Sequence, residues 1–453
     1  MKNKIRKYIP KFLLNFYHLL WSLFFALLNK FPSKKIIVIG ITGTKGKTTV
    51  CYLTYFLLKK LGFKVALSSS DYSFINDEEI KKTERLTMPG KGFLQKFLKK
   101  AVDSGCEIAV IEVTSEGLMQ NRHSFIDFDI AVFLNLHPEH IEHHGSYEKY
   151  KKDKGKLFKA LEKSKTRKYL RGFPIKKTII VNLDDFESDY YLEFKAEQKI
   201  AFALEATNFD QNFLVKPKSY KISKKGIEFT LGEKNFFSPL IGKTNLYNIL
   251  AVFSILKALN LSFNLVSESL KEFKGLPGRM DIIDAKGFKI IIDYAHTPDS
   301  IEELYKTILD IFKPKRLLCL IGAAGGLRDK WKRPKIGEIA AKYCSYIVIS
   351  DEDPFDEDPE IINKAIELGA LNYLKEYGIE KPVEIINDRK EGIYRLIELA
   401  NKGDIVVSIG KGNENSIIYK DRKLEWNEKE IFLEALKEIK KNKSHSKTST
   451  KTL

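Results

Sequence analysis

Short apolar runs alternate with amphipathic stretches along the first third of the chain. The apolar runs show no polar alternation, which predicts strands buried on both faces, and the stretches between them have helical periodicity. The expected strands are 36–42, 64–69, 107–113 and 129–136, and the expected helices are 47–61 and 93–104. Strands that alternate with helices in this way are typical of a parallel α/β sheet.

The pattern changes near residue 196 and returns to the first type after residue 275. Residues 196–240 contain short alternating segments that predict half-exposed antiparallel strands, and a helix is expected at 246–259. The later buried strands are expected at 289–294, 316–321, 346–350, 383–386 and 404–409. We therefore predict a central α/β domain at 36–274 and a second, doubly wound α/β domain at 275–436.

The two ends of the chain differ from both predicted domains. The tail, 437–453, is rich in Lys, Ser and Thr without an apolar pattern and is predicted to be disordered. Residues 1–35 are basic and hydrophobic, and within them 12–28 read as an apolar helix with a thin polar stripe. The stripe consists of Asn15, His18, Ser22 and Asn29.

Three interpretations of this N-terminal helix stay open. It could pack on the first domain, it could lie in a membrane interface and contact lipid through residues 10–31, or it could form a short span, which is the least favoured. No small-residue cleavage site follows it, which argues against a cleaved signal peptide.

The composition is that of a globular protein with a basic surplus. Hydrophobic residues make up 43% and charged residues 30%, and the net charge is +18. Such a charge could attract nucleic acid, an anionic membrane or phosphorylated substrates. Because eight Lys or Arg and no acidic residue fall within 1–35, and more lysines lie in the tail, much of the surplus is terminal. We therefore expect no nucleic-acid partner.

The four cysteines form no C-x-x-C pair, and each lies in or beside an apolar run. They are Cys51, Cys106, Cys319 and Cys344. This pattern predicts buried free thiols in a reducing cytoplasm and argues against a cysteine zinc ribbon.

A glycine loop between the first predicted strand and the first predicted helix is the clearest chemical signal. It consists of Gly43, Thr44, Lys45, Gly46, Lys47, Thr48 and Thr49. Backbone N–H groups in such a loop, together with the helix N-terminus, can hold phosphates. Lys47 is suited to neutralise phosphate charge and the Thr48 hydroxyl to bind Mg²⁺. The loop therefore predicts an ATP site.

Acidic and histidine residues follow the later strands of the first domain. Glu112 ends a buried strand, where a carboxylate is well placed for Mg²⁺. Five of the eight histidines fall between 123 and 144. Their spacing matches neither H-E-x-x-H nor H-x-x-E-H, so the cluster does not predict a zinc site.

The loop sequence T-G-T-x-G-K-T-T resembles the ATP loop of the Mur ligases and the folylpolyglutamate synthetases. Further ordered motifs extend the resemblance over roughly 36–430. They include segments similar to E-V-S-S-H at 112–116, N-L-x-x-D-H-L-D-x-H-G at 135–145, A-K-x-x-L-F at 153–158, N-x-D-D at 182–185 and G-x-x-N-x-x-N at 242–248. The resemblance implies a P-loop-type central ATPase domain with a parallel sheet and a Rossmann-like C-terminal domain.

The resemblance also implies roles for residues of the first domain. Glu112 and His140 would be Mg²⁺ ligands, and Lys154 would be carbamylated so that its new carboxylate helps to hold Mg²⁺. Asn245 and Asn248 would lie near the adenine, although they could cap a helix instead. The candidates for contact with the acceptor substrate are Thr87, Thr114, Ser115 and Arg122.

The second domain carries similar signatures. Gly278-Arg279 and the segment D-Y-A-H-T-P at 293–298 imply that Arg279, Asp293 and His296 act on the nucleotide side of the site. A run similar to G-x-G-G-x-R-D contains Arg328. A run similar to G-K-G-H-E contains Gly410 and Glu414, and Glu414 could hold the substrate amine.

One difference from the family concerns the incoming amino acid. The segment Glu352-Asp353-Pro354-Phe355 stands where diaminopimelate-adding members have D-N-P-R, so Phe355 replaces the arginine that grips the distal carboxylate. This replacement favours lysine or another amine over diaminopimelate.

The resemblance is closest to the members that add the third residue to UDP-N-acetylmuramoyl-dipeptide. It predicts an ATP- and Mg²⁺-dependent amide ligase that works through an acyl phosphate, in the cytoplasm or at the inner face of the membrane. Those members carry an N-terminal UDP-binding domain, for which residues 1–35 are too short. A ligase or amidating enzyme acting on a lipid-linked precursor therefore remains an alternative, and a basic nucleic-acid-binding NTPase is a weaker one.

Overall fold

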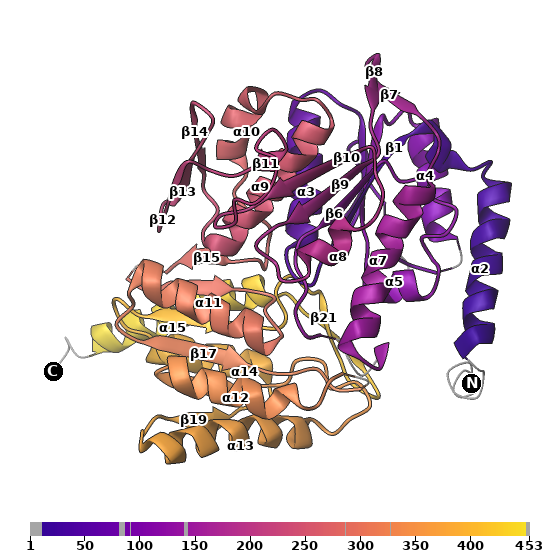
Figure 1. Cartoon of the computed structure of the whole chain (residues 1–453). Coiled ribbons are helices and arrows are strands. Elements are labelled where there is room, and N and C mark those ends of the chain that lie inside the picture. Colours follow the sequence, from indigo (N-terminus) through magenta and orange to yellow (C-terminus); the bar gives the residue numbers. More distant parts are fainter. Residues whose placement is uncertain are drawn as a thin grey trace. The chain divides into compact units, whose positions relative to one another are not determined.

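The computed structural model of the chain describes residues 11–80, 87–90, 92–139, 144–285, 287–326 and 328–449. The chain divides into two compact units, Met1–Lys274 (unit 1) and Gly275–Leu453 (unit 2). Each unit is built on a sheet of mainly parallel strands with helices packed against it (Figure 1). The predicted α/β class is confirmed.

Unit 1 contains a nine-stranded sheet with the order β11-β10-β9-β6-β1-β5-β2-β3-β4. Its strands are β1 (Ile37–Thr42), β2 (Val65–Ser68), β3 (Ser73–Ile75), β4 (Glu78–Glu79), β5 (Ile108–Glu112), β6 (Ile130–Phe133), β9 (Thr178–Asn182), β10 (Gln198–Phe202) and β11 (Leu214–Val215). All neighbours from β11 to β2 are parallel, and β3 and β4 are antiparallel additions at one edge. β1 lies between β5 and β6, and all of its residues are buried.

Helices cover both faces of this sheet, which is why its strands are continuous apolar runs. Side chains of α4, α7 and α8 join one face of the strands in a single core, whereas α3 and α9 pack against each other and against the opposite face. The helices of unit 1 are α2 (Lys11–Leu28), α3 (Lys47–Lys60), α4 (Phe93–Asp103), α5 (Ser115–Met119), α7 (Tyr147–Lys163), α8 (Ser188–Leu192), α9 (Lys243–Ala258) and α10 (Ser267–Glu272), with 3₁₀ turns η1 (Pro32–Lys35) and η2 (Phe263–Val266).

The segment 196–240 corrects one prediction. β10 and β11 join the parallel sheet, and the antiparallel prediction for them is wrong. β12 (Ser219–Ser223), β13 (Gly226–Leu231) and β14 (Lys234–Ser238) do form the expected antiparallel sheet. A further hairpin joins β7 (Lys168–Leu170) to β8 (Phe173–Ile175).

The N-terminal helix α2 packs on unit 1 beside α4 (Figure 1). The ring of Phe25 lies where a Cβ on Gly92 would be, and Lys96 stands over that ring at 4.6 Å. Ser22 Oγ donates to the carbonyl of Asn121 at 3.0 Å. Packing on the first domain, one of the three predicted alternatives, is therefore confirmed. Within the described residues, no helix has the length and apolarity needed to cross a bilayer.

Unit 2 contains a six-stranded sheet with the order β15-β16-β20-β17-β18-β19, parallel except for β15. The strands are β15 (Asp281–Asp284), β16 (Lys289–Ile292), β17 (Leu317–Ile321), β18 (Tyr346–Ile349), β19 (Val383–Ile385) and β20 (Ile405–Ser408), with a separate hairpin of β21 (Ser416–Ile418) and β22 (Lys423–Glu425). The helices are α11 (Pro298–Phe312), α12 (Lys332–Tyr343), α13 (Pro359–Tyr377), α14 (Arg389–Leu399) and α15 (Glu428–Ser449). α15 continues through most of the tail, 437–453, for which the sequence predicts disorder.

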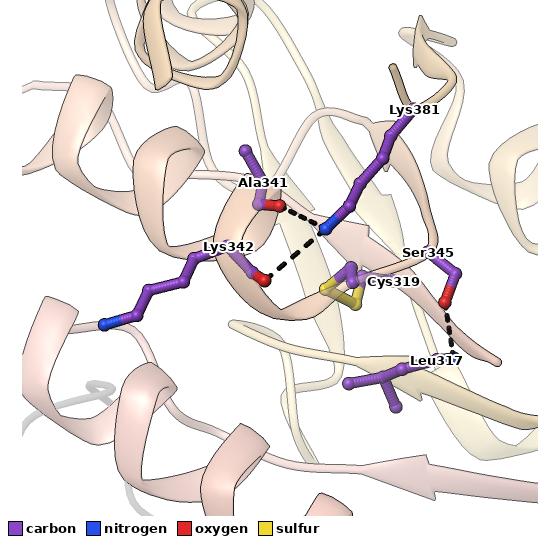
Figure 2. Close-up of a disulfide and its surroundings, with 7 residues drawn as sticks. Leu317, Cys319, Ala341, Lys342, Ser345 and Lys381 are labelled. Atoms are coloured by element: carbon purple, nitrogen blue, oxygen red, sulfur yellow. Dashed lines mark hydrogen bonds between the residues drawn. A yellow bond between two sulfur atoms is a disulfide. The ribbon is translucent and has the colours of Figure 1, made fainter. Parts of the chain in front are cut away.

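The cysteines correct a second prediction. Cys51 and Cys106 are buried thiols outside any disulfide, as expected, but Cys319 and Cys344 form a disulfide (Figure 2). Cys319 lies in β17 and Cys344 follows α12, and their Cα atoms are 6.1 Å apart, within the usual range for a disulfide. The two residues are 25 positions apart in sequence. They meet because the chain runs from β17 through α12 to β18, which pairs with β17.

Counting reactive thiols tests this pairing. If cells are lysed in denaturant with an excess of alkylating agent, we expect two reactive cysteines per chain without reductant, Cys51 and Cys106, and four after reduction. Four reactive thiols before reduction would show that Cys319 and Cys344 are reduced in the cell.

Candidate active site

The glycine loop leads from β1 into α3, as predicted. Gly46 precedes the helix with a φ of 83°, a conformation that residues with a Cβ rarely adopt. A Cβ at Gly46 would also overlap Oδ1 of Asn248 on α9. The loop therefore needs glycine for two separate reasons, and the first-turn N–H groups of α3 begin directly after it.

Two lysine amines meet at one carbonyl of this loop. Lys47 Nζ donates to the carbonyls of Gly43 at 2.9 Å and Thr44 at 2.8 Å. Lys154 Nζ, from α7, donates to the same Gly43 carbonyl at 2.8 Å. Lys154 is only 2% exposed. Burial first, and then the charge of Lys47, hold the pKa of Lys154 well below its usual range, so its amine is more readily neutral than that of an exposed lysine.

Glu112 contacts the same loop through Thr48. It ends β5 and is 2% exposed, and its carboxylate accepts from Thr48 Oγ1 at 3.0 Å. The same carboxylate accepts from the backbone N–H and the hydroxyl of Ser70, each at 2.9 Å. A carboxylate and a hydroxyl thus lie side by side at the carboxyl end of the sheet, which is a hard-oxygen donor set.

Three residues that the sequence did not single out as site residues support the same loop. Asn135 Oδ1 accepts from the N–H groups of Thr44 at 3.1 Å and Lys45 at 2.8 Å. The Tyr150 hydroxyl is 3.1 Å from Thr44 Oγ1, and Ser70 holds Glu112. Ser70 and Asn135 both follow a parallel strand closely, and that position is the signal that could have found them.

Asn245 and Asn248 lie in the first turns of α9, and neither caps it. The residue before α9 is Gly242, without a side-chain cap. Asn245 Nδ2 donates to the Ile241 carbonyl at 2.8 Å, and Asn248 Nδ2 donates to Asn245 Oδ1 at 3.1 Å. Asn248 is thereby oriented beside Gly46, and its predicted contact with adenine stays a prediction.

Substitution of Gly46 tests how tightly the loop is built. We expect Gly46→Ala to lower stability by more than the roughly 1–2 kcal/mol of a left-handed alanine, because Asn248 must also move. It should weaken ATP binding as well. Gly62→Ala is the matched control, since Gly62 has a φ of 78° but open space around it. Equal effects of the two substitutions on melting temperature and nucleotide affinity would contradict this account of the loop.

The predicted acceptor contacts fall into two groups. Thr87 Oγ1 lies 2.6 Å from Ser70 Oγ, which joins it to Glu112. Ser115 Oγ lies 3.1 Å from His144 Nε2, and His144 Nδ1 is 2.7 Å from Asp153 on α7. The Ser115 and His144 side chains are buried, so the contacts from Ser115 through His144 to Asp153 position α5 against α7.

The other two acceptor candidates flank α5, Thr114 before it and Arg122 after it. Thr114 caps α5 by accepting from the Gly117 N–H at 3.2 Å. Arg122 donates to Gln120 Oε1 at 2.6 Å and to the carbonyl of Met88. His140, the predicted second Mg²⁺ ligand, lies outside the described residues.

In unit 2, the Asp293 carboxylate joins its own loop to the turn before β15. Its carboxylate accepts from the N–H groups of Met280 and Ala295, each at 2.7 Å. Burial raises the pKa of Asp293, and the nearby Arg279 opposes this effect. The Arg279 guanidinium stacks on the ring of Tyr294 at 4.2 Å. His296 follows in the same loop, with Nδ1 2.9 Å from the Tyr294 carbonyl. Nucleotide contacts by these residues stay predictions.

A buried charge cluster gathers several of the predicted amine-side residues. Lys411 is fully buried, and its Nζ donates to Asp353 at 2.9 Å and to Glu414 at 2.6 Å. A Cβ on Gly410 would overlap the carboxylate of Glu352, which brings a third carboxylate to this loop. Burial raises the pKa of Glu414, with Lys411 acting in the opposite direction. Arg328, which is predicted to contact substrate from a separate glycine-rich run, is exposed.

Two family matches cover most of the chain. Residues 41–256 match the Mur ligase middle domain, and residues 278–412 match the Mur ligase glutamate ligase domain. A UDP-N-acetylmuramyl-tripeptide synthetase of Borreliella afzelii is 37% identical over 421 residues, which cover 91% of this chain and 79% of the relative. A UDP-N-acetylmuramoyl-L-alanyl-D-glutamate–2,6-diaminopimelate ligase of Prochlorococcus marinus is 36% identical and covers 89% and 78% of the two chains.

Solved structures give the same result at the level of the fold. A UDP-N-acetylmuramoyl-L-alanyl-D-glutamate–2,6-diaminopimelate ligase superposes with a TM-score of 0.59 at 26% identity, covering 89% of this chain and 78% of the other. The folylpolyglutamate synthase of Mycobacterium tuberculosis reaches 0.67 at 15% identity, covering 86% and 92%, and so shares the fold. The chain belongs to the Mur ligase family of ATP-dependent amide ligases.

Proposed function

We propose that this chain joins an amino acid to the free carboxylate of a UDP-linked muramoyl dipeptide, after activating that carboxylate as an acyl phosphate. The observation that carries the proposal is the convergence of Lys47, Lys154 and the Thr48–Glu112 pair on one glycine loop. The names of the relatives, tripeptide synthetase and diaminopimelate ligase, supply the acceptor class.

The loop fits the triphosphate of ATP. A Cβ at Gly43 would press on Leu134, and one at Gly46 would overlap Asn248, so the backbone here is packed as closely as a phosphate-binding loop requires. Lys47 lies inside the loop, where its amine could leave the two carbonyls it now contacts and bind phosphate oxygens.

The donor atoms also fit Mg²⁺. Thr48 and Glu112 offer a hydroxyl and a carboxylate, and a carbamate on Lys154 would add a second carboxylate at the same loop. The ion would supply charge neutralisation for phosphoryl transfer. Lys154 suits carbamylation because its lowered pKa leaves the neutral amine that reacts with CO₂.

The proposed reaction has two steps. A carboxylate oxygen of the acceptor attacks the γ-phosphorus of ATP, and ADP leaves. The amine of the amino acid then attacks the acyl carbon and loses a proton, and inorganic phosphate leaves with the original carboxylate oxygen. Lys47 would stabilise the charge that develops on the transferred phosphoryl group.

The chemistry of unit 2 supports a basic amino acid as the second substrate. Asp353 and Glu414 accept from Lys411, and Glu352 brings a third carboxylate to the same loop. Phe355 stands where diaminopimelate-adding members have arginine, so the chain has no cation at that position to bind a distal carboxylate. An excess of carboxylates and the missing arginine both favour lysine over diaminopimelate.

Phosphate release with one amine at a time tests this proposal. With ATP, Mg²⁺ and UDP-N-acetylmuramoyl-L-Ala-D-Glu, we expect release only when an amine is added, and at least about tenfold higher kcat/KM for lysine than for diaminopimelate. Preference for diaminopimelate would overturn the amine assignment. Preference for ammonium would indicate an amidating enzyme instead.

A lipid-linked acceptor is the second candidate, and the exposed apolar face of α2 is the observation that favours it. Activity on a lipid-linked muramoyl peptide, with none on the UDP-linked form, would select this candidate. In either case the use of ATP places the reaction in the cytoplasm, as part of peptidoglycan synthesis.

A further inference from the structure

Helix α2 turns its polar stripe toward the protein and its apolar face outward, which is the reverse of the usual arrangement. From residue 15 to 28, where its side chains are described, the large exposed ones are all apolar and lie within an arc of about 120° of the helix, at 100° per residue. They are Phe16, Tyr17, Leu20, Phe24, Leu27 and Leu28, with exposed fractions from 49% to 63%. A helix on the surface of a globular protein normally turns such a face inward.

The polar stripe of α2 is the side that faces the protein. Ser22 Oγ donates to the Asn121 carbonyl, and Asn121 Nδ2 donates to the Asn15 carbonyl at 3.4 Å. Phe25 and Ala26 are buried beside this stripe. The apolar arc therefore remains outside as a consequence of how α2 docks, and Figure 1 shows the helix at the edge of unit 1.

The charged residues of the N-terminal segment are of one sign. Residues 1–35 carry eight Lys or Arg and no acidic residue. Among them, Lys30 and Lys34 follow the C-terminal end of α2 and are exposed. An apolar, aromatic-rich face followed in the chain by exposed lysines is complementary to an anionic lipid surface, where apolar side chains enter the interface and lysines meet headgroups.

The length of α2 decides between lying on a membrane and crossing one. Its 18 residues extend about 27 Å, a little less than a hydrocarbon core of roughly 30 Å. The polar stripe would also have to enter lipid if the helix crossed, whereas its contacts with Asn121 keep it on the protein. A helix that lies parallel to the membrane surface keeps its polar stripe on the protein and its apolar arc in contact with lipid.

We propose that α2 is an interfacial helix that holds this enzyme on anionic membrane surfaces through Phe16, Leu20, Phe24, Leu27 and their neighbours. The helix keeps its polar stripe on unit 1 and places its apolar arc among the lipid headgroups. Membrane binding by α2 is independent of which acceptor the active site uses, so it stands or fails separately from the proposed function.

Vesicle flotation of the full chain tests the proposal. We expect binding to vesicles of phosphatidylcholine with phosphatidylglycerol, little binding to phosphatidylcholine alone, and weaker binding at high salt. The variant Leu20→Glu, Phe24→Glu, Leu27→Glu should bind at least about tenfold less, with a melting temperature that changes by no more than a few degrees, because about half of each of these side chains is exposed.

The matched control changes three exposed apolar residues of α13. Ile361, Leu368 and Leu371 are 62%, 58% and 47% exposed, and their replacement by Glu should leave vesicle binding unchanged. Absence of binding to anionic vesicles would overturn the proposal, as would equal loss in the two triple variants. A dimer in solution that the α2 variant dissociates would show that a second copy covers the face, and this too would overturn it.

Discussion

Lys47→Ala is expected to lower the rate of ATP-dependent amide formation by at least about 10³-fold. The side chain lies inside the glycine loop with its amine on the Gly43 and Thr44 carbonyls, at the position where a triphosphate would bring several negative charges. No other amine donates to both carbonyls in the described residues, and Lys154, which shares the Gly43 carbonyl, is less readily charged. The measurement is inorganic phosphate release with acceptor and amine at saturation.

Two controls separate loss of chemistry from loss of fold. Lys60→Ala removes a lysine from the end of the same helix, where it pairs with Glu272 on the surface, and should leave the rate unchanged. The melting temperature of Lys47→Ala without ATP should stay within a few degrees of the unchanged protein. Full activity of Lys47→Ala would place the ATP site elsewhere.

Lys154→Ala is expected to cost about 10²-fold or more in kcat. A carbamate at Lys154 would supply a carboxylate beside the glycine loop, and its loss would leave Thr48 and Glu112 as the ligands in the described residues. If that carboxylate is what matters, added formate or acetate should restore part of the activity. Lys152→Ala, an exposed lysine on the same helix, is the control.

The lowered pKa of Lys154 gives this prediction a pH dependence. Because burial favours the neutral amine, the carbamate should form at lower pH than on an exposed lysine. Labelled bicarbonate should therefore give a ¹³C carbamate signal near neutral pH, absent from Lys154→Ala. A labelled signal that persists in the variant, or a loss of activity that short carboxylates never restore, would assign Lys154 a purely structural role at the Gly43 carbonyl.

The sequence was informative where local pattern decides the structure. The run 36–42, the glycine loop and the helix that follows form a continuous signal, and β1 and α3 lie there within one residue. The parallel strands of the second domain also lie where the sequence predicts them, because each is a separate apolar run. The sequence pattern wrongly predicts an antiparallel strand for β10, because the residues Gln198–Phe202 do not reveal that their partner is β9. That pairing is decided by residues distant in the sequence.

The same distinction applies to the site. Lys47, Thr48 and Glu112 could be predicted because each belongs to a motif at the end of a strand. Ser70 and Asn135 depend on the strand order, which places β5 between β1 and β2 and places β6 beside β1. The Cys319–Cys344 disulfide also depends on tertiary neighbours, and neither the spacing nor the flanking residues of the two cysteines signalled it.

The central claim is that this chain transfers the γ-phosphoryl group of ATP to a carboxylate before the amide forms. The most direct test uses an acceptor whose reacting carboxylate is labelled with ¹⁸O, followed by mass spectrometry of the inorganic phosphate released. We expect each phosphate to carry one oxygen from the carboxylate, because the bridging oxygen leaves with phosphorus when the amine attacks. Phosphate without the label, formed while the amide is made, would contradict an acyl phosphate and with it the mechanism proposed here.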